Sequence, residues 1–275
     1  MLRDYLPKFL RKVLQADSGS ASVEAPAILT TVEQTEAEPF TQLMPTTEST
    51  ETEQIIQKIR PYSMVPDSGV EFLIKAVQSI YEQQIEGDFV ECGVWRGGCA
   101  AAMKLAERSL QPHSQRLLHL FDSYEGLPPV QPIDGPMAAG WQQAVDSPWY
   151  FDNCTASLED VQRNFSQLGL LDSEVHFYKG WFETTVPEFV KGKSERKIAI
   201  LRLDGDWYES TKVCLENLYP LVSEKGIIII DDYYAWDGCA VAVHEYLGSN
   251  GLNHRIRSIP DFSSAYIIKQ AHRDA

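Results

Sequence analysis

The sequence has no long apolar run, no block of basic residues and no regular cysteine spacing. No stretch approaches the about 18 apolar residues that a transmembrane helix requires, and we expect neither a membrane span nor a signal peptide. The 5 cysteines form no C-x-x-C motif and no zinc-ligand spacing, which favours a reducing, cytoplasmic environment. A net charge of -15 without a basic block excludes nucleic acid as a partner, because such binding depends on neutralising phosphates.

Acidic side chains are concentrated near the N-terminus, and they set the predicted domain boundaries. Residues 1–16 have apolar positions at helical spacing with basic side chains between them, which predicts an amphipathic helix. That helix could cover its own domain, dock on a second subunit of a homo-oligomer or on another protein, or lie on a membrane surface. Residues 17–57 hold eight acidic and no basic side chains and predict a flexible linker, with a helix resuming at 51–62. Residues 58–275 suffice for one α/β domain.

Two short apolar runs, Ile198 to Leu203 and Ile227 to Ile230, flank a segment with the apolar periodicity of a helix. This pattern predicts a βαβ unit with two buried parallel strands. Acidic residues follow each run, namely Asp204, Asp206, Asp231 and Asp232. Because parallel strands end at the same edge of a sheet, these carboxylates should face one pocket, where a Mg²⁺ ion would relieve their repulsion. The alternative for any single one is an N-cap or turn-forming role.

The first predicted core strand, Phe89 to Val94, runs into glycines that precede a helix of small residues. Glycines there let a ligand approach the backbone and the helix N-terminus closely. The full G-x-G-x-x-G spacing is missing, with Trp95 in place of the second glycine, which disfavours a dinucleotide. The second strand, Leu117 to Phe121, ends at Asp122, which is placed either to bind ribose hydroxyls or to form a turn. Together these strand ends predict a nucleoside pocket.

The rest of the domain completes a predicted seven-stranded sheet. A third strand, Val175 to Tyr178, precedes Trp181, which is either an adenine-stacking residue or a core residue. The last two strands, Arg255 to Ile259 and Ala265 to Ile268, are too close together for a crossover helix and predict an antiparallel hairpin. An irregular insertion at 125–156 follows a strand end and is expected to recognise a substrate. The predicted fold is a Rossmann-like, mostly parallel α/β sheet with a C-terminal antiparallel hairpin and helices on both faces.

Five sequence motifs occur in an order typical of one enzyme family. They are DFVECGVWRGG at residues 88–98, FDSYEGLP at 121–128, KGWF at 179–182, LDGDWYEST at 203–211 and DDY at 231–233. In this set and order the sequence resembles the macrocin O-methyltransferase (TylF-like) family of class I S-adenosylmethionine-dependent methyltransferases, over residues 70–269. The resemblance implies Mg²⁺-dependent methyl transfer to a hydroxyl of a sugar or glycosylated natural-product acceptor, in natural product biosynthesis.

The resemblance also implies roles for individual residues. Glu91 and Gly93 would line the methionine part of S-adenosylmethionine, and Asp122 would hold its ribose. Asp206 would be the general base that takes the proton of the acceptor hydroxyl. Further cofactor contacts are expected at Ser123, Gly180, Trp181 and Asp204. The expected Mg²⁺ ligands are Asp204, Asp231 and Asp232.

One position departs from the family pattern, and three further functions compete with this interpretation. Thr184 stands where an Asp usually follows the Gly-Trp-Phe motif, which affects the predicted adenine pocket. Asp204-Gly-Asp206 also has the D-x-D form of a metal-dependent glycosyltransferase. A catechol-type O-methyltransferase that acts on a non-sugar hydroxyl is the second competing function, and a non-catalytic binding module is the third.

Overall fold

The computed structural model describes residues 50–192, 195–261 and 263–270. The predicted amphipathic helix at 1–16 and linker residues 17–49 lie outside the described residues. The remaining linker residues, 50–57, belong to helix α2 (Thr50–Ile59), so the predicted boundary between residues 57 and 58 falls inside a helix. None of the described helices combines the length and the apolar content that crossing a bilayer demands.

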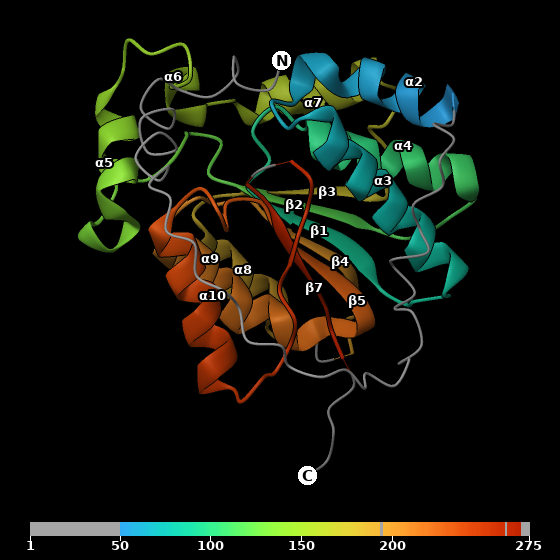
Figure 1. The fold of residues 1–275 in the computed structure, drawn as a ribbon. Coiled ribbons are helices and arrows are strands. Elements are labelled where there is room, and N and C mark those ends of the chain that lie inside the picture. Colours follow the sequence, from blue (N-terminus) through green and yellow to red (C-terminus); the bar gives the residue numbers. More distant parts are fainter. Residues whose placement is uncertain (1–49, 193–194, 262, 271–275) are drawn as a thin grey trace, which may run out of the picture. The chain divides into compact units, whose positions relative to one another are not determined.

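A seven-stranded sheet forms the centre of the described chain (Figure 1). Its strands are β1 (Asp88–Cys92), β2 (Leu118–Asp122), β3 (Val175–Lys179), β4 (Ile198–Leu203), β5 (Val222–Ile230), β6 (Arg257–Ser258) and β7 (Ala265–Ile268). The spatial order is β3-β2-β1-β4-β5-β7-β6. Strands β1 to β5 pair in parallel, whereas β7 is antiparallel to both β5 and β6. The predicted sheet and its C-terminal hairpin are therefore confirmed.

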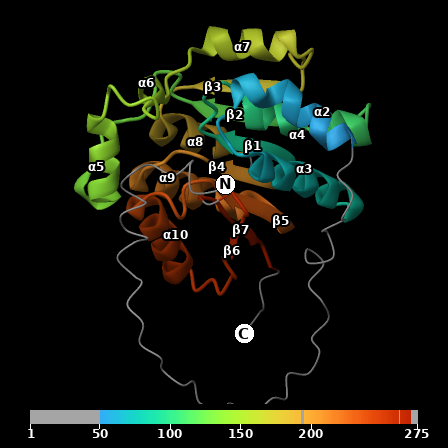
Figure 2. The same ribbon diagram turned by 45° about the horizontal axis from the view of Figure 1, so that its top comes forward.

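Helices cover both faces of this sheet, as predicted (Figures 1 and 2). One face carries α2, α3 (Asp67–Glu82) and α4 (Gly98–Leu110). The other carries α8 (Phe182–Val190), α9 (Tyr208–Leu218) and α10 (Asp237–Ser249). Helix α7 (Leu158–Gln167) begins with a side-chain cap, since the Ser157 hydroxyl accepts the Asp160 N–H at 3.1 Å. Short 3₁₀ turns occupy Arg60–Tyr62, Pro132–Asp134 and Tyr219–Leu221.

The central strand β4 sets the position of the site. All six of its residues are buried, as expected for a strand with helices on both faces. Its last residue, Leu203, pairs with Cys92 of β1 on one side and with Ile230 of β5 on the other. The residues that follow these three strands consequently start from one row at the carboxyl edge of the sheet. The order also reverses beside β1, and open α/β sheets bind ligands at such a switch point.

Two segments differ from the sequence prediction. Strand β5 begins at Val222 rather than at Ile227, because a register shift between Ile198 and Ile200 lets the polar start of β5 join the sheet. That start is partly exposed, so it lacks the apolar pattern that marks a buried strand. The insertion at 125–156 is not wholly irregular, since it contains helix α5 (Gly135–Gln143) and a one-turn element at Phe151–Cys154.

Candidate active site

A cleft with about 930 Å³ of empty space, part of it open solvent, lies at the carboxyl edge of the sheet and forms a cavity there. Nine of the ten predicted site residues line it, namely Glu91, Gly93, Asp122, Ser123, Trp181, Asp204, Asp206, Asp231 and Asp232. Gly180 is not among the lining residues; its N–H donates to the Asp122 carbonyl at 2.9 Å and so aligns the ends of β2 and β3. The two halves predicted separately from the sequence, a nucleoside pocket and an acidic cluster, therefore share one cavity.

Glycine is required at position 93 by the protein's own backbone. Gly93 has φ +89°, and a Cβ added there would lie 1.7 Å from the carbonyl oxygen of Asp204. The turn after β1 thus packs directly on the turn after β4, which leaves no room for a side chain. Gly98 plays a similar part, because a Cβ there would lie 2.5 Å from the Tyr62 carbonyl oxygen. This close approach brings residues 62–65 to the wall of the cavity.

Arg202 lies at the centre of the acidic residues and was missed by the sequence interpretation. Its Nη1 donates to Glu91 Oε1 at 2.8 Å and to Asp204 Oδ2 at 2.7 Å. Its Nη2 donates to Asp231 Oδ1 at 2.5 Å. Only 3% of the side chain is exposed, and the neighbouring carboxylates raise the pKa of Arg202 against the effect of burial. The only available signal was a single charged residue inside the apolar run of β4.

Glu91 is buried, and one of its oxygens is free to meet a ligand. Its Oε2 has no hydrogen-bond partner among the described residues, although Oε1 accepts from Arg202. Burial, only partly opposed by Arg202, raises the pKa of Glu91 to about 8. A buried, unsatisfied carboxylate oxygen on a cavity wall is costly without a ligand and fits a positively charged or hydrogen-bond-donating group.

Three carboxylates meet at the ends of β4 and β5. One oxygen from each of Asp204, Asp206 and Asp232 lies within 4.8 Å of the others. The Asp206 N–H donates to Asp232 Oδ2 at 3.1 Å, and the indole N–H of Trp236 donates to Asp206 Oδ1 at 2.9 Å. Burial and mutual repulsion raise the pKa of Asp206 and of Asp232 well above the usual range. Burial raises that of Asp204 to about 7 against the effect of Arg202.

This arrangement fits a hard divalent cation, because Mg²⁺ and Ca²⁺ prefer oxygen ligands and a cation would offset the repulsion. Asp231, predicted as a ligand, is placed differently from the other three. Its Oδ1 accepts from Arg202 and from the Ser264 hydroxyl at 3.3 Å, and its carboxylate also contacts that of Asp204. The structure therefore gathers Asp204 and Asp232 with Asp206, and holds Asp231 beside them through Arg202.

Asp122 has a structural task, the turn-forming role that the sequence offered as the alternative to ribose binding. Its Oδ2 accepts the N–H groups of Val94 at 2.7 Å and Trp95 at 3.1 Å, and its Oδ1 accepts that of Tyr124 at 2.7 Å. Burial raises the pKa of this carboxyl despite these bonds. Asp122 therefore fixes the turn after β1, and a ribose would have to share its oxygens with the backbone. The adjacent Ser123 hydroxyl donates to the Gly126 carbonyl at 2.8 Å.

Aromatic rings lie on the cavity wall and beside its acidic residues. Trp181 is 43% exposed, so it is not a core residue, and it lines the cavity where adenine was expected. On the side of Asp206, Trp207 and Trp236 lie with ring centroids 5.4 Å apart, and Trp141 of the insertion packs on both at 6.1 Å. The insertion thus reaches the neighbourhood of the predicted base through tryptophan contacts. The sequence did not predict that Trp141, Trp207 and Trp236 pack together.

An unusual turn of the insertion also reaches the cavity. Residues Phe151–Cys154 all have positive φ, between 51° and 56°, which is a left-handed helical turn without glycine. Such residues cost energy and persist only where their surroundings hold them. Asn153 does so here, because its side-chain amide donates to the Leu127 carbonyl at 2.8 Å and its carbonyl accepts the Leu127 N–H at 3.0 Å. Cys154 at the end of this turn lines the cavity.

Comparison with known proteins identifies the family. The sequence matches the family described as Macrocin-O-methyltransferase (TylF) over residues 6–269. The chain belongs to the macrocin O-methyltransferase family. Family members similar to it include the 8-demethyl-8-(2,3-dimethoxy-alpha-L-rhamnosyl)-tetracenomycin-C 4'-O-methyltransferase of Streptomyces olivaceus, which is 38% identical over 72% of each chain. The mycinamicin III 3''-O-methyltransferase of Micromonospora griseorubida is 37% identical over 72% of this chain and 75% of that enzyme.

Solved structures agree with this macrocin O-methyltransferase assignment. The O-methyltransferase NovP is 32% identical, with a TM-score of 0.64 over 76% of this chain and 83% of that one. The calicheamicin methyltransferase CalS11, at 21% identity and a TM-score of 0.55 over 86% of this chain and 99% of that one, shares the fold. The protein is therefore an S-adenosylmethionine-dependent O-methyltransferase, as predicted. Family membership gives no support to a glycosyltransferase or to a non-catalytic binding module.

Proposed function

We propose that this macrocin O-methyltransferase family member methylates a hydroxyl on the sugar of a glycosylated natural product, in a reaction that depends on Mg²⁺. The observation that carries the proposal is the meeting of Asp204, Asp206 and Asp232 in the same cavity as Glu91. A metal-binding set beside a cofactor pocket suits methyl transfer to an unactivated alcohol. The Streptomyces olivaceus relative is named for a rhamnosyl-bearing compound, which supports a sugar acceptor.

In this proposal the cofactor lies along the ends of β1, β2 and β3. The unpaired Oε2 of Glu91 accepts from the ammonium group of the methionine part, and Gly93 lines the cavity beside it. Asp122 and Ser123 meet the ribose, and the exposed ring of Trp181 borders the adenine; Gly180 contributes by joining the ends of β2 and β3. We assign no cofactor contact to Thr184. Its N–H donates to the Trp181 carbonyl and so belongs to the first turn of α8.

The acceptor half lies at the ends of β4 and β5. We assign Asp204, Asp231 and Asp232 to the Mg²⁺ ion, with Asp231 using Oδ2, and Asp206 to the proton. When bound, Mg²⁺ lowers the pKa of an alcohol and orients its oxygen. Asp206 then takes the proton on Oδ2, because Trp236 holds its Oδ1 at 2.9 Å. The turn at 151–154 borders the acceptor through Cys154, and the tryptophans beside Asp206 shield that carboxylate from water.

A methylation assay tests the proposal. The purified enzyme is incubated with isotope-labelled S-adenosylmethionine and a panel of glycosylated natural products, each paired with its aglycone. We expect label to enter glycosylated members only, to be lost with EDTA and to return with Mg²⁺. Transfer to the aglycones would instead favour a catechol-type O-methyltransferase. Full activity in EDTA after prior metal removal would contradict the proposed Mg²⁺ dependence. The proposed methyl transfer would still stand.

A second measurement separates the metal ligands from the base. Asp231→Asn and Asp206→Asn are compared in a titration with Mn²⁺, a spectroscopic substitute for Mg²⁺. We expect Asp231→Asn to weaken Mn²⁺ binding and Asp206→Asn to leave it within a few-fold of the wild type. If Asp206→Asn weakens Mn²⁺ binding and Asp231→Asn does not, Asp206 is a metal ligand. The 4.8 Å grouping of Asp206 with Asp204 and Asp232 would agree with that result.

A further inference from the structure

Arg202 is bonded to carboxylates from three strands, and its placement differs from that of an ordinary ion pair. Glu91 belongs to β1, Asp204 follows β4 and Asp231 follows β5. Each gives one oxygen to Arg202, and all three line the cavity. The oxygens that do not bond Arg202 are Oε2 of Glu91, Oδ1 of Asp204 and Oδ2 of Asp231.

We propose that Arg202 is the positioning residue of this active site: its guanidinium aims one carboxylate at the cofactor and two at the metal, and so couples the two binding sites. The inference rests on the proposed function, because it takes Glu91 to meet the cofactor and the acids to hold Mg²⁺. Arg202 itself meets neither ligand in this assignment. Its effect on both passes through the carboxylates that it holds.

The chemistry of the guanidinium suits this task. It is planar and always charged, and it presents several N–H donors in a fixed fork, so it orients carboxylates by direction as well as by charge. The strand register supplies the geometry, since Glu91 and Arg202 are paired neighbours on β1 and β4. A lysine at this position keeps the charge but is a flexible point donor that cannot reproduce the fork.

The outer end of the array is also anchored. Ser264, at the start of the last hairpin strand, donates to the same Asp231 oxygen that Arg202 binds, at 3.3 Å. Its own N–H donates to Asp261 at 2.9 Å, and both Ser264 and Asp261 are buried. The hairpin therefore limits rotation of Asp231 from the side opposite to Glu91. Asp231 therefore has a second anchor, whereas Arg202 is the one hydrogen-bond donor to the Glu91 side chain among the described residues.

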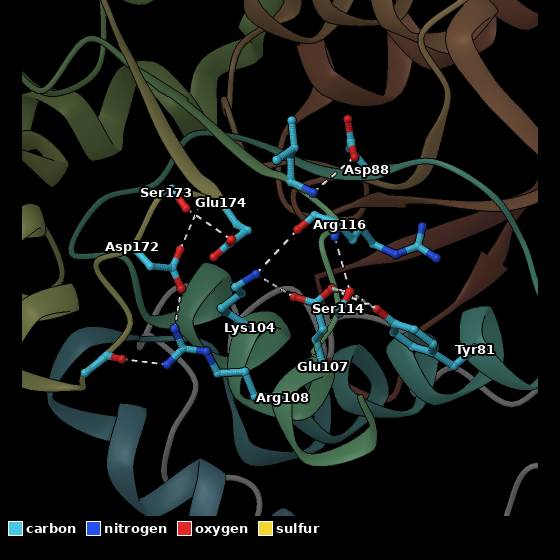
Figure 3. A network of polar contacts seen from close by, with 12 residues as sticks. Tyr81, Asp88, Lys104, Glu107, Arg108, Ser114, Arg116, Asp172, Ser173 and Glu174 are labelled. Carbon is cyan, nitrogen blue, oxygen red and sulfur yellow. Dashed lines mark hydrogen bonds and ion pairs between the residues drawn. The ribbon is translucent and has the colours of Figure 1, made fainter. Parts of the chain in front are cut away.

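The test compares Arg202→Lys with the wild type in two separate titrations, one with S-adenosylhomocysteine and one with Mn²⁺. We expect both affinities to fall about tenfold or more, which is the usual effect of removing a group that orients metal ligands. Glu91→Gln should weaken mainly S-adenosylhomocysteine binding, and Asp204→Asn mainly Mn²⁺ binding. The control is Arg116→Lys, which removes a partly buried guanidinium outside the cavity and should change neither affinity (Figure 3).

Specific results would overturn the inference. Unchanged affinities in Arg202→Lys would mean that charge alone matters, and tighter Mn²⁺ binding would mean that Arg202 only competes with the metal. Loss of one affinity alone would refute the coupling. If Arg202→Lys does not fold, Ser264→Ala must then weaken Mn²⁺ binding for the inference to stand. Failure of the wild type to bind Mn²⁺ would instead contradict the proposed function, so the two failures are distinguishable.

Discussion

Two clusters of buried charge in this protein differ in one decisive respect, the balance between cations and anions. Near the start of β2, Lys104 pairs with Glu107 at 2.8 Å, with 2% and 1% of the side chains exposed (Figure 3). Glu107 also accepts the hydroxyls of Tyr81 and Ser114, both at 2.8 Å, and Lys104 donates to the Arg116 carbonyl at 3.4 Å. One positive charge thus meets one negative charge, and hydrogen bonds satisfy both.

The Arg202 cluster is neither balanced nor saturated. One guanidinium faces three carboxylates, and Glu91 keeps a buried oxygen without a partner among the described residues. A balanced cluster can serve packing alone, because nothing in it awaits a ligand. Excess negative charge on a cavity wall is typical of a binding site. Charge balance, rather than burial, therefore separates the structural cluster from the functional one.

The largest expected effect is on the catalytic side. Asp206→Asn should lower kcat by about 10² to 10⁴, the usual contribution of a general base, while leaving S-adenosylhomocysteine binding intact. Steady-state methyl transfer and a cofactor titration on the same preparation measure the two quantities. A kcat near that of the wild type would remove Asp206 from the mechanism and leave the Arg202 cluster with a binding role only.

The balanced cluster should respond in stability instead. Lys104→Met leaves Glu107 buried without its cation and should lower the free energy of unfolding by about 3 to 5 kcal/mol, measured by urea denaturation. Activity per folded molecule should not change. The matched control is Lys104→Met with Glu107→Gln, which keeps acceptors for Tyr81 and Ser114 and should recover much of the loss. No recovery would show that the ion pair does more than balance charge.

The next largest effect is on the pH dependence of stability, which Glu91 of the Arg202 cluster should influence. The pKa of Glu91 is raised to about 8, so between about pH 4.5 and pH 8 the unfolded chain loses this proton before the folded one does. The free energy of unfolding contributed by Glu91 should therefore fall as pH rises through that window. Glu91→Gln removes this titration and should flatten the curve, measured by urea unfolding in EDTA at several pH values. Parallel curves for the two proteins would contradict the raised pKa.

The smallest expected effect concerns the outer anchor of the Arg202 cluster. Ser264→Ala removes one hydrogen bond to Asp231, worth about 0.5 to 1.5 kcal/mol, and should weaken Mn²⁺ binding by a few-fold. Cofactor affinity should change less, because Glu91 lies at the other end. Ser173→Ala, at an exposed hydroxyl bonded to Glu174, is the matched control. Equal effects of the two substitutions would mean that Asp231 does not depend on the hairpin.

Much of the fold was predictable because its signals are local. Apolar runs and helical periodicity placed β1 to β4, and the short link before β7 predicted an antiparallel hairpin. The early part of β5 was not predictable, because its side chains are polar and it joins the sheet through a register shift. The turn at 151–154 was equally hidden, since left-handed backbone at Phe151 and Cys154 has no sequence preference behind it.

The site likewise has a part that the sequence predicted and a part that it did not. Asp204, Asp206, Asp231 and Asp232 could be assigned to one edge from the sequence because parallel strands must end together. Their partners could not be assigned, since the contacts of Arg202, Ser264 and Trp236 join residues far apart in the chain. A single arginine in an apolar strand was the one local hint, and its meaning depended on which carboxylates the register placed beside it.

The sequence by itself determined that this protein has a mostly parallel sheet whose edge carries acids, and its motifs determined the family. Periodicity and strand-end chemistry are properties of neighbouring residues, so one chain is enough to read them. Only the tertiary structure decided which carboxylates share Arg202, which of them meet as a group of three, and which oxygen of Glu91 stays free. Those properties depend on distances between strands, and the packing of the whole sheet sets them.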